Sequence, residues 1–293
     1  MAQNNQNFQE LSYNAQKEHW IRDAATPERL NVHQGWFRED TVDFWRHERM
    51  SEAVYQCLLN ARADRWLTVG DGRYGLDAIR MLRRGFSDVT ASDLSDHLLQ
   101  VSLKAGALKK ISAENAEKLS FADCSFDYVL CKESFHHFPR PMLALYEMLR
   151  VASKGIVLIE PQDAHIDMPT LSGKHAAGYE ADGNYVYTLS RREVEKVALG
   201  LDLPAVAFKN LYDVFDHNLT DELAQEDNPQ FIAFRNRVLD LEERCARMEL
   251  KHNVLLAVIF ITMPTEEEIQ QFTKRSWSFE KLDRNPFILH THR

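Results

Sequence analysis

The sequence predicts an α/β fold in which a doubly wound, mostly parallel sheet of seven strands carries helices on both faces. Short apolar runs alternate with helical patterns between Arg65 and Pro161, as expected for consecutive βαβ units. A glycine-rich turn, WLTVGDGRYG at 66–75, ends the first apolar run. An acid, Asp93, ends the second run, and this combination is typical of Rossmann-like sheets that hold an adenosine group.

The glycine turn joins a buried strand to a helix. Trp66–Val69 form an apolar run too short for a helix. Gly70, Gly72 and Gly75 leave the backbone bare, so a ligand can approach it closely and the helix LDAIRMLRR can begin at once. The same spacing satisfies the dinucleotide fingerprint, so an NAD(P)-dependent oxidoreductase has to be considered beside other adenosine-binding enzymes.

The other elements follow from the periodicity of apolar residues and from turn and capping residues. We expect strands at 66–69, 88–92, 110–113, 126–131, 155–160, 204–215 and 254–263, with a short strand-like piece at 185–189. Helices are expected at 8–25, 40–55, 76–84, 95–106, from Pro141 onward, and at 191–199, 228–251 and 264–274. Pro141 suits a first helical turn, Ser190 suits an N-cap, and Thr265 with Glu268 forms a capping box.

The chain from about Trp66 to Pro161 resembles the class I S-adenosylmethionine-dependent methyltransferases, specifically their small-molecule enzymes of the type 11-like group. The glycine turn and Asp93 carry part of this resemblance. ISAENAEKLSFADCSFDYVLCKESFHHF at 111–138 carries the rest, because it matches the family's polar loop and following strand.

The resemblance implies S-adenosylmethionine as the cofactor and assigns residues to it. The glycine loop lies under the methionine part, Asp93 accepts hydrogen bonds from both ribose hydroxyls, and Leu94 lies against the adenine. Asn115 contacts the adenine amino group, the Ala116 N–H faces the ring, and Lys132 touches the cofactor mainly through its backbone. The implied cofactor-binding residues are Gly70, Asp71, Gly72, Asp93, Leu94, Asn115, Ala116 and Lys132.

Two positions depart from the family pattern. Relatives often carry an acid at the position of Thr68, and the last glycine of their loop is replaced here by Tyr74. Both departures affect the contacts expected at the methionine end of the cofactor and leave the expected fold unchanged.

The candidate catalytic residues follow the fourth strand, where the ligand lies in open α/β sheets. An acceptor hydroxyl or ammonium group must lose a proton, which requires a base that is active near neutral pH. We expect His136 or His137 to be that base, with Glu133 orienting one of them or binding substrate. Glu160, Gln162, Asp163 and His165 follow the fifth strand and could bind polar substrate groups or be solvated. The spacing of the histidines and acids matches no fixed metal motif, so no metal is expected.

We expect two regions in the chain. Residues 1–60 form an N-terminal helical lid over the cofactor or a cover for the sheet, with Tyr13, Trp36 and Arg49 as the side chains of interest. Residues 61–293 form the methyltransferase domain, with acceptor-side insertions at about 162–190 and 216–252. The second insertion is expected to shape the acceptor pocket or a dimer contact, so a homodimer is one expected assembly.

The net charge and the distribution of apolar residues limit the binding partners that we expect. The chain has 35 Lys and Arg against 44 Asp and Glu, a net charge of −9, whereas binding to nucleic acid requires a basic surface. The N-terminus has no apolar signal core, and the longest apolar stretch, 254–263, is too short to cross a bilayer. We therefore expect a cytoplasmic enzyme with a small-molecule acceptor and with neither nucleic acid nor membrane as partner.

The sequence thus predicts an S-adenosylmethionine-dependent methyltransferase. Its acceptor is expected to be an oxygen of a small polar metabolite, such as a sugar, a nucleotide-linked sugar or a natural-product intermediate. Two alternatives stay open: an NAD(P)-dependent oxidoreductase, and a protein that binds S-adenosylmethionine without catalysis.

Overall fold

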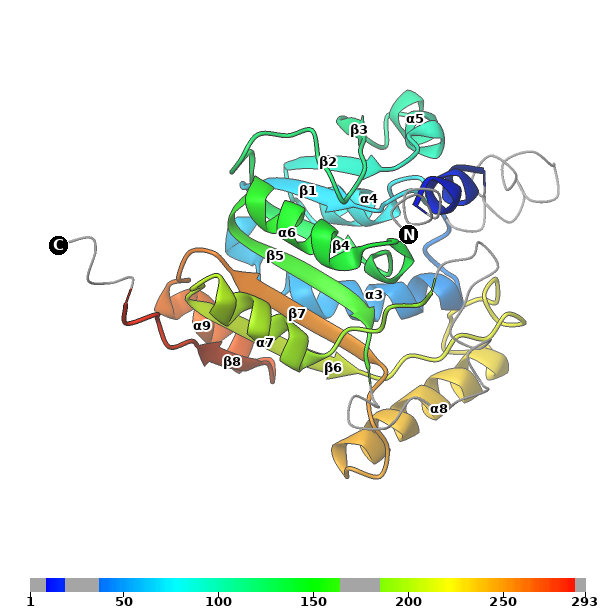
Figure 1. Cartoon of the computed structure of the whole chain (residues 1–293). Coiled ribbons are helices and arrows are strands. Elements are labelled where there is room, and N and C mark those ends of the chain that lie inside the picture. The colour runs from blue at the N-terminus through cyan, green and yellow to red at the C-terminus, as the bar shows by residue number, and fades with distance from the viewer. Residues whose placement is uncertain (1–8, 19–36, 164–184, 288–293) are drawn as a thin grey trace.

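The computed structural model of the protein describes residues 9–18, 37–163 and 185–287. An eight-stranded sheet lies at its centre (Figure 1), in the order β3-β2-β1-β4-β5-β7-β6-β8. The strands are β1 (Arg65–Val69), β2 (Asp88–Asp93), β3 (Ile111–Ala113), β4 (Phe126–Lys132), β5 (Ala152–Pro161), β6 (Ala205–Leu211), β7 (Val254–Phe260) and β8 (Ser278–Lys281).

The sheet is mixed, and it confirms the predicted α/β class. β1 to β5 are parallel, whereas β7 runs antiparallel to both β5 and β6. The predicted count of seven strands was one too few, because β8 adds an antiparallel edge strand beside β6. The strand-like piece expected at 185–189 is wrong as well: Leu189 makes an isolated bridge to Gln162, and no strand forms there.

Helices cover both faces of the sheet because each face is apolar. The first core contains Trp66, which is 1% exposed and stacks on Tyr128 at 4.7 Å between ring centroids. It lies under α3 (Val42–Tyr55), α4 (Leu76–Arg83), α5 (His97–Lys104) and α9 (Glu266–Thr273). The second core lies under the helices in front of the sheet in Figure 1, α6 (Pro141–Val151) and α7 (Arg191–Gly200).

The capping and first-turn residues predicted from the sequence are present at the N-terminal ends of α6, α7 and α9. Ser190 and Thr265 each accept a hydrogen bond from the backbone N–H three residues on, and both capping boxes are complete. Pro141 lies in the first turn of α6. The connections also contain two short 3₁₀ turns, η1 (Leu59–Ala61) and η2 (Phe135–His137). Within the described residues, no helix is long and apolar enough to cross a membrane.

One helix, α8 (Pro229–Ala246), lies away from the sheet and packs on α3 instead (Figure 1). Trp45 of α3 meets the ring of Phe231 edge-on at 5.5 Å between centroids. The loop before α8 also pairs with the start of α3, where the N–H groups of Val42 and Asp43 donate to the carbonyls of Glu222 (2.9 Å) and Thr220 (3.1 Å). The insertion and the segment before β1 therefore form one packed unit.

The order of the strands places a ligand crevice beside β1. The chain passes from β1 to β2 and β3 on one side of β1, and later returns to β4 and β5 on the other side. The loops after β1 and β4 therefore diverge at the carboxyl ends of these strands, which is where open α/β sheets bind ligands.

Candidate active site

A cavity of about 880 Å³ lies at the carboxyl ends of β1, β2 and β4, within the size range of small-molecule sites. It is also lined by side chains of α3, α4 and residues 9–18. The structure brings most of the predicted site residues together on its wall: Gly70, Asp71, Asp93, Leu94, Asn115, Ala116, Lys132, Glu133 and His137. Gly72 and His136 are not part of the wall.

Gly70 lets two loops of the site meet. Its φ of +74° is one that L side chains rarely adopt, and a Cβ at this position would lie 2.4 Å from the Cβ of Ser134. The Ser134 hydroxyl donates a 2.6 Å hydrogen bond to the Gly70 carbonyl. Tyr74, which replaces a family glycine, also adopts a left-handed conformation with φ of +60°. The loop therefore keeps the turn that the glycine would provide.

Asp71 is a buried acid beneath the cavity. Its carboxylate accepts hydrogen bonds from the N–H groups of Asp77 (3.2 Å) and Ala78 (3.0 Å) at the start of α4. Burial and the neighbouring Asp77 carboxylate raise the pKa of Asp71 to about 8, against the effect of these donors. Asp71 therefore tethers the glycine loop to α4.

Asp93 ends β2 with its carboxylate at the cavity and is 9% exposed. It accepts a 3.0 Å hydrogen bond from the N–H of Ser95. Burial raises the pKa of Asp93 to about 6, while the N–H groups of Ser95 and Gly72 lower it. The carboxylate is thus ionised at neutral pH and can accept hydrogen bonds from hydroxyl groups.

Residues 9–18 are helical and contribute to the wall beside the loop that contains Asn115. The Tyr13 hydroxyl donates to the Glu117 carboxylate at 2.7 Å, and the Gln16 amide donates to the carbonyl of His137 at 2.5 Å. Tyr13 therefore lies where a lid residue was expected. Arg49 instead donates to Glu242 of α8 at 2.8 Å and does not line the cavity, and Trp36 lies outside the described residues.

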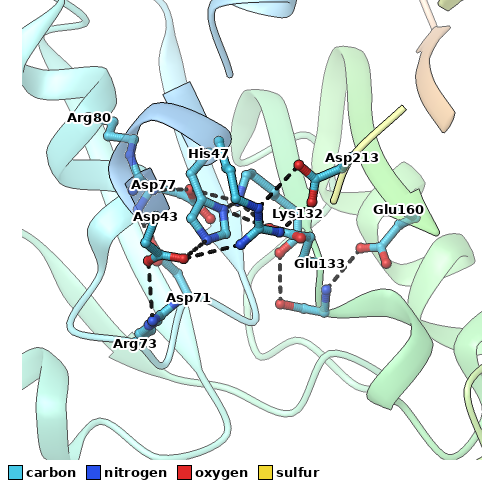
Figure 2. A network of polar contacts seen from close by, with 12 residues as sticks. Asp43, His47, Asp71, Arg73, Asp77, Arg80, Lys132, Glu133, Glu160 and Asp213 are labelled. Atoms are coloured by element: carbon cyan, nitrogen blue, oxygen red, sulfur yellow. Dashed lines mark hydrogen bonds and ion pairs between the residues drawn. The ribbon is translucent and has the colours of Figure 1, made fainter. Parts of the chain in front are cut away.

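A compact charge cluster lies at the tip of β4 (Figure 2). The Lys132 ammonium, whose side chain is 3% exposed, lies 2.7 Å from the Glu133 carboxylate and 2.8 Å from Nδ1 of His47. His47 Nδ1 is also 2.9 Å from Glu133. Burial by itself raises the pKa of Glu133, but Lys132 and His47 outweigh it and hold that pKa well below its usual range.

The cluster continues through α3 to the loop before α8. Asp43 lies 3.4 Å from His47 Nε2, 3.3 Å from Arg46 and 3.5 Å from Arg73. Arg46 in turn donates from Nε to Asp213 at 3.2 Å. Opposite charges alternate through this network, as Figure 2 shows, so each buried charge has a compensating partner.

Glu133 lies against Lys132 and His47, and its predicted role, to orient His136 or His137 or to bind substrate, stays a prediction. His136 instead lies 2.7 Å from the fully buried Glu160, which also accepts the N–H groups of Ser134 (2.9 Å) and Phe135 (3.0 Å). This pair holds the η2 turn together behind the cavity wall.

Other predicted polar residues take no part in the cavity. Glu160, Gln162 and Asp163 do not line it, and His165 lies outside the described residues. In the described part of the chain, no group of three or more His, Cys, Asp or Glu side chains could hold a metal ion.

The wall also contains residues that were not predicted, among them His47, Arg73 and His217. His47 lies four residues after Asp43 on a predicted helix, a spacing that places both on one face and could have indicated the pair. His217 lies in a polar loop without periodicity, and the sequence holds no signal that it reaches the cavity.

Residues 67–159 match the family model of the methyltransferase domain. By this match, residues 67–159 are a methyltransferase domain. The matched segment runs from β1 to the end of β5 and contains the glycine loop, Asp93 and the charge cluster after β4. A methyltransferase domain with this sheet implies S-adenosylmethionine as its cofactor.

Known proteins similar to this chain include an O-methyltransferase, rstn1, of Aspergillus nomiae, which is 30% identical over 135 residues. That match covers 42% of this chain and 59% of the relative. The uncharacterized protein YafE of Escherichia coli K12 is 41% identical over 78 residues, covering 25% of this chain and 38% of that protein. The chain thus spans less than two thirds of either relative.

Among solved structures, the [4+2]-cyclase SpnF has a TM-score of 0.50 and 15% sequence identity, covering 78% of this chain and 86% of that one. This likeness shows the shared fold of the methyltransferase domain. Because that structure is described as a cyclase, the fold by itself does not decide the reaction.

The residues present fit S-adenosylmethionine. The backbone at Gly70 is bare where a Cβ would collide with Ser134, and a buried carboxylate, Asp93, faces the cavity two strands from Lys132. A bare loop after β1 and an acid after β2 are what an adenosine group requires in this kind of sheet.

Proposed function

We propose that the protein transfers a methyl group from S-adenosylmethionine to an oxygen of a small polar metabolite, such as a sugar, a nucleotide-linked sugar or a natural-product intermediate. The observation that carries this proposal is the polarity of the cavity wall beyond the cofactor residues. That part of the wall is formed by His47, Arg73, Glu133 and His217. Such side chains can form hydrogen bonds with hydroxyl and other polar groups, which an apolar acceptor does not offer.

The cofactor would occupy the part of the cavity beside β1, β2 and β3. Asp93 would accept hydrogen bonds from the ribose hydroxyls, Leu94 and Ala116 would border the adenine, and Asn115 would contact its amino group. Gly70, Asp71 and Gly72 would form the turn under the methionine part, and residues 9–18 would close the cavity over the adenine end. When bound, the cofactor supplies an electrophilic methyl group on a sulfonium.

The acceptor would lie on the other side of β1, beside β4 and the unit of α3 and α8. The protein has to hold the acceptor oxygen about 3 Å from the methyl group, in line with the breaking bond, and to exclude water. It also has to take up the hydroxyl proton. Of the predicted base candidates, His137 lines the cavity and His136 does not.

The match to the methyltransferase family disfavours the oxidoreductase alternative, since the segment with the glycine loop is the matched one. A protein that binds S-adenosylmethionine without transferring its methyl group stays the main competitor. The polar acceptor side favours an enzyme over that alternative.

The test is a measurement of S-adenosylhomocysteine release from S-adenosylmethionine, with catechol, glucose and UDP-glucose as probe acceptors. We expect release that depends on the acceptor, together with a methylated product of matching mass. Tight cofactor binding without any acceptor-dependent release would instead identify a binding protein.

A further inference from the structure

Three histidines line the cavity, and their contacts place them in different surroundings. Both ring nitrogens of His47 face charged groups: Nδ1 lies 2.8 Å from the Lys132 ammonium, and Nε2 lies 3.4 Å from the Asp43 carboxylate. A ring held from both edges inside a charge network can position its neighbours. It is poorly placed to take up a proton from a substrate.

His137 lies on the cofactor side. It lies within electrostatic reach of Asp93, and its ring lies against that of His136 with 4.1 Å between centroids. Its carbonyl accepts the Gln16 amide of the covering helix at 2.5 Å. These contacts place His137 near the proposed ribose position and away from the acceptor.

His217 lies on the loop between β6 and α8, on the acceptor side. Its ring packs edge-on against Phe215 with 4.4 Å between centroids, and the Arg46 guanidinium lies 4.8 Å from the centre of the Phe215 ring. Arg46 in turn lies within the electrostatic reach of Glu133. His217 is thus linked through Phe215 and Arg46 to the charge cluster at the tip of β4. Within the described part of the chain, the ring nitrogens of His217 make no hydrogen bond.

The loop that carries His217 is fixed on both sides of it. Before it, Asp213 is held by Arg46 and by the side chain of Asn253, which accepts the Asp213 N–H at 2.8 Å. After it, the Thr220 carbonyl accepts the N–H of Asp43 at 3.1 Å. Both anchors hold the loop against the body of the domain, and His217, an exposed residue between them, lines the cavity.

We propose that His217 is the base that takes the proton of the acceptor. This inference rests on the proposed function and names a residue of that same site. The acceptor oxygen forms a bond to the methyl carbon, and the carbon–sulfur bond breaks with its electron pair staying on sulfur. The hydroxyl proton passes to the imidazole of His217, which becomes imidazolium and later releases the proton to solvent. The charged groups on or against its loop are Asp43, Arg46 and Arg49 on α3, Asp213, Asp216, Asp221 and Glu222 on the loop, and Glu133 after β4.

The test compares His217→Gln and His137→Gln with the wild-type enzyme, using the probe acceptor that gives the highest turnover. His97→Gln is the matched control, because His97 is an exposed histidine at the start of α5, outside the cavity. We expect His217→Gln to lower kcat by about 10²- to 10⁴-fold, the contribution typical of a general base, with unchanged affinity for S-adenosylhomocysteine. The residual rate of this variant should rise with pH, as hydroxide replaces the lost base.

His137→Gln is expected to weaken S-adenosylhomocysteine binding and to lower kcat less than His217→Gln does. A His217→Gln enzyme within twofold of the wild-type kcat, with the same pH profile, would overturn the assignment while leaving the proposed function intact. Absence of methyl transfer by the wild-type enzyme to all three probe acceptors would overturn both proposals.

Discussion

Thr68 and Asp71 are joined by a hydrogen bond of 2.9 Å from the threonine hydroxyl to the carboxylate. Thr68 stands where related enzymes often carry an acid, and it is 1% exposed at the end of β1. The Asp71 carboxylate, in the glycine loop, also accepts two N–H groups of α4. This loop therefore carries a buried acid although β1 itself contains none.

Asp71→Asn should change how stability depends on pH. Because the folded protein raises the pKa of Asp71 to about 8, folding takes up a proton between about pH 4 and about pH 8. The free energy of unfolding contributed by Asp71 therefore falls as pH rises through this window. Urea unfolding at about pH 5 and about pH 8 should show wild type losing stability relative to the variant. Equal changes in the two proteins would contradict the raised pKa.

Asp93→Asn should weaken S-adenosylhomocysteine binding. Hydrogen bonds to a charged group contribute about 1.5–3 kcal/mol, so we expect a loss of roughly 10- to 100-fold in affinity by calorimetry. Asp96→Asn is the control, because Asp96 lies near by at the N-terminus of α5 and does not line the cavity. Equal affinities of both variants would remove Asp93 from the cofactor site.

The wild-type protein offers a second test of Asp93. Its pKa is raised to about 6, so the carboxylate is protonated as pH falls through that value. Affinity for S-adenosylhomocysteine should therefore be full above about pH 7 and should decrease below about pH 6. In Asp93→Asn this decrease should be absent. A wild-type affinity that stays constant down to about pH 5 would argue against an ionised Asp93 as the ribose acceptor.

Much of the fold could be predicted because its signals are local. β1, β4 and β5 each contain a short apolar run, and the caps at Ser190 and Thr265 mark helix starts by residue type alone. β8 could not be predicted in the same way. Ser278–Lys281 holds three polar residues and one apolar residue at the sheet edge, and pairing with β6 decides that it forms a strand.

The wall residues at the carboxyl ends of β1, β2 and β4 could be predicted, because each directly follows or ends a strand recognised in the sequence. The site was not predictable where elements far apart in the chain meet. His47 reaches the tip of β4 from α3, and the loop of His217 is anchored by α3 and by Asn253. His136 was expected at the site, but its ring contacts Glu160, 24 residues later in the chain, behind the cavity wall.

Gly70→Ala should destabilise the protein more than a change at another left-handed glycine. The new Cβ would lie 2.4 Å from Ser134 Cβ, whereas at Gly106, with φ of +75°, a Cβ meets nothing within 4 Å. Gly106→Ala thus measures the backbone strain alone, on the order of 1–3 kcal/mol. Gly70→Ala should lose more by urea unfolding and should also bind S-adenosylhomocysteine more weakly. Equal losses would show that the contact with Ser134 is easily relieved.

Arg46→Met should destabilise the junction between α3 and the loop before α8. The side chains of Arg46 and Asp213 are 5% and 9% exposed, so removal of the cation leaves a buried carboxylate without its partner. The expected cost is about 3–5 kcal/mol in the free energy of unfolding. Adding Asp213→Asn to this variant should recover part of the loss. A double variant as unstable as the sum of both single variants would contradict the pairing.

The central claim, that the cavity holds S-adenosylmethionine, is tested most directly by calorimetric titration of the wild-type protein. S-adenosylmethionine, S-adenosylhomocysteine, NAD⁺ and NADP⁺ would be titrated separately under the same conditions. We expect binding of the two adenosyl sulfur compounds at one site and no binding of either nicotinamide nucleotide. Binding of NAD⁺ or NADP⁺ alone would contradict the account.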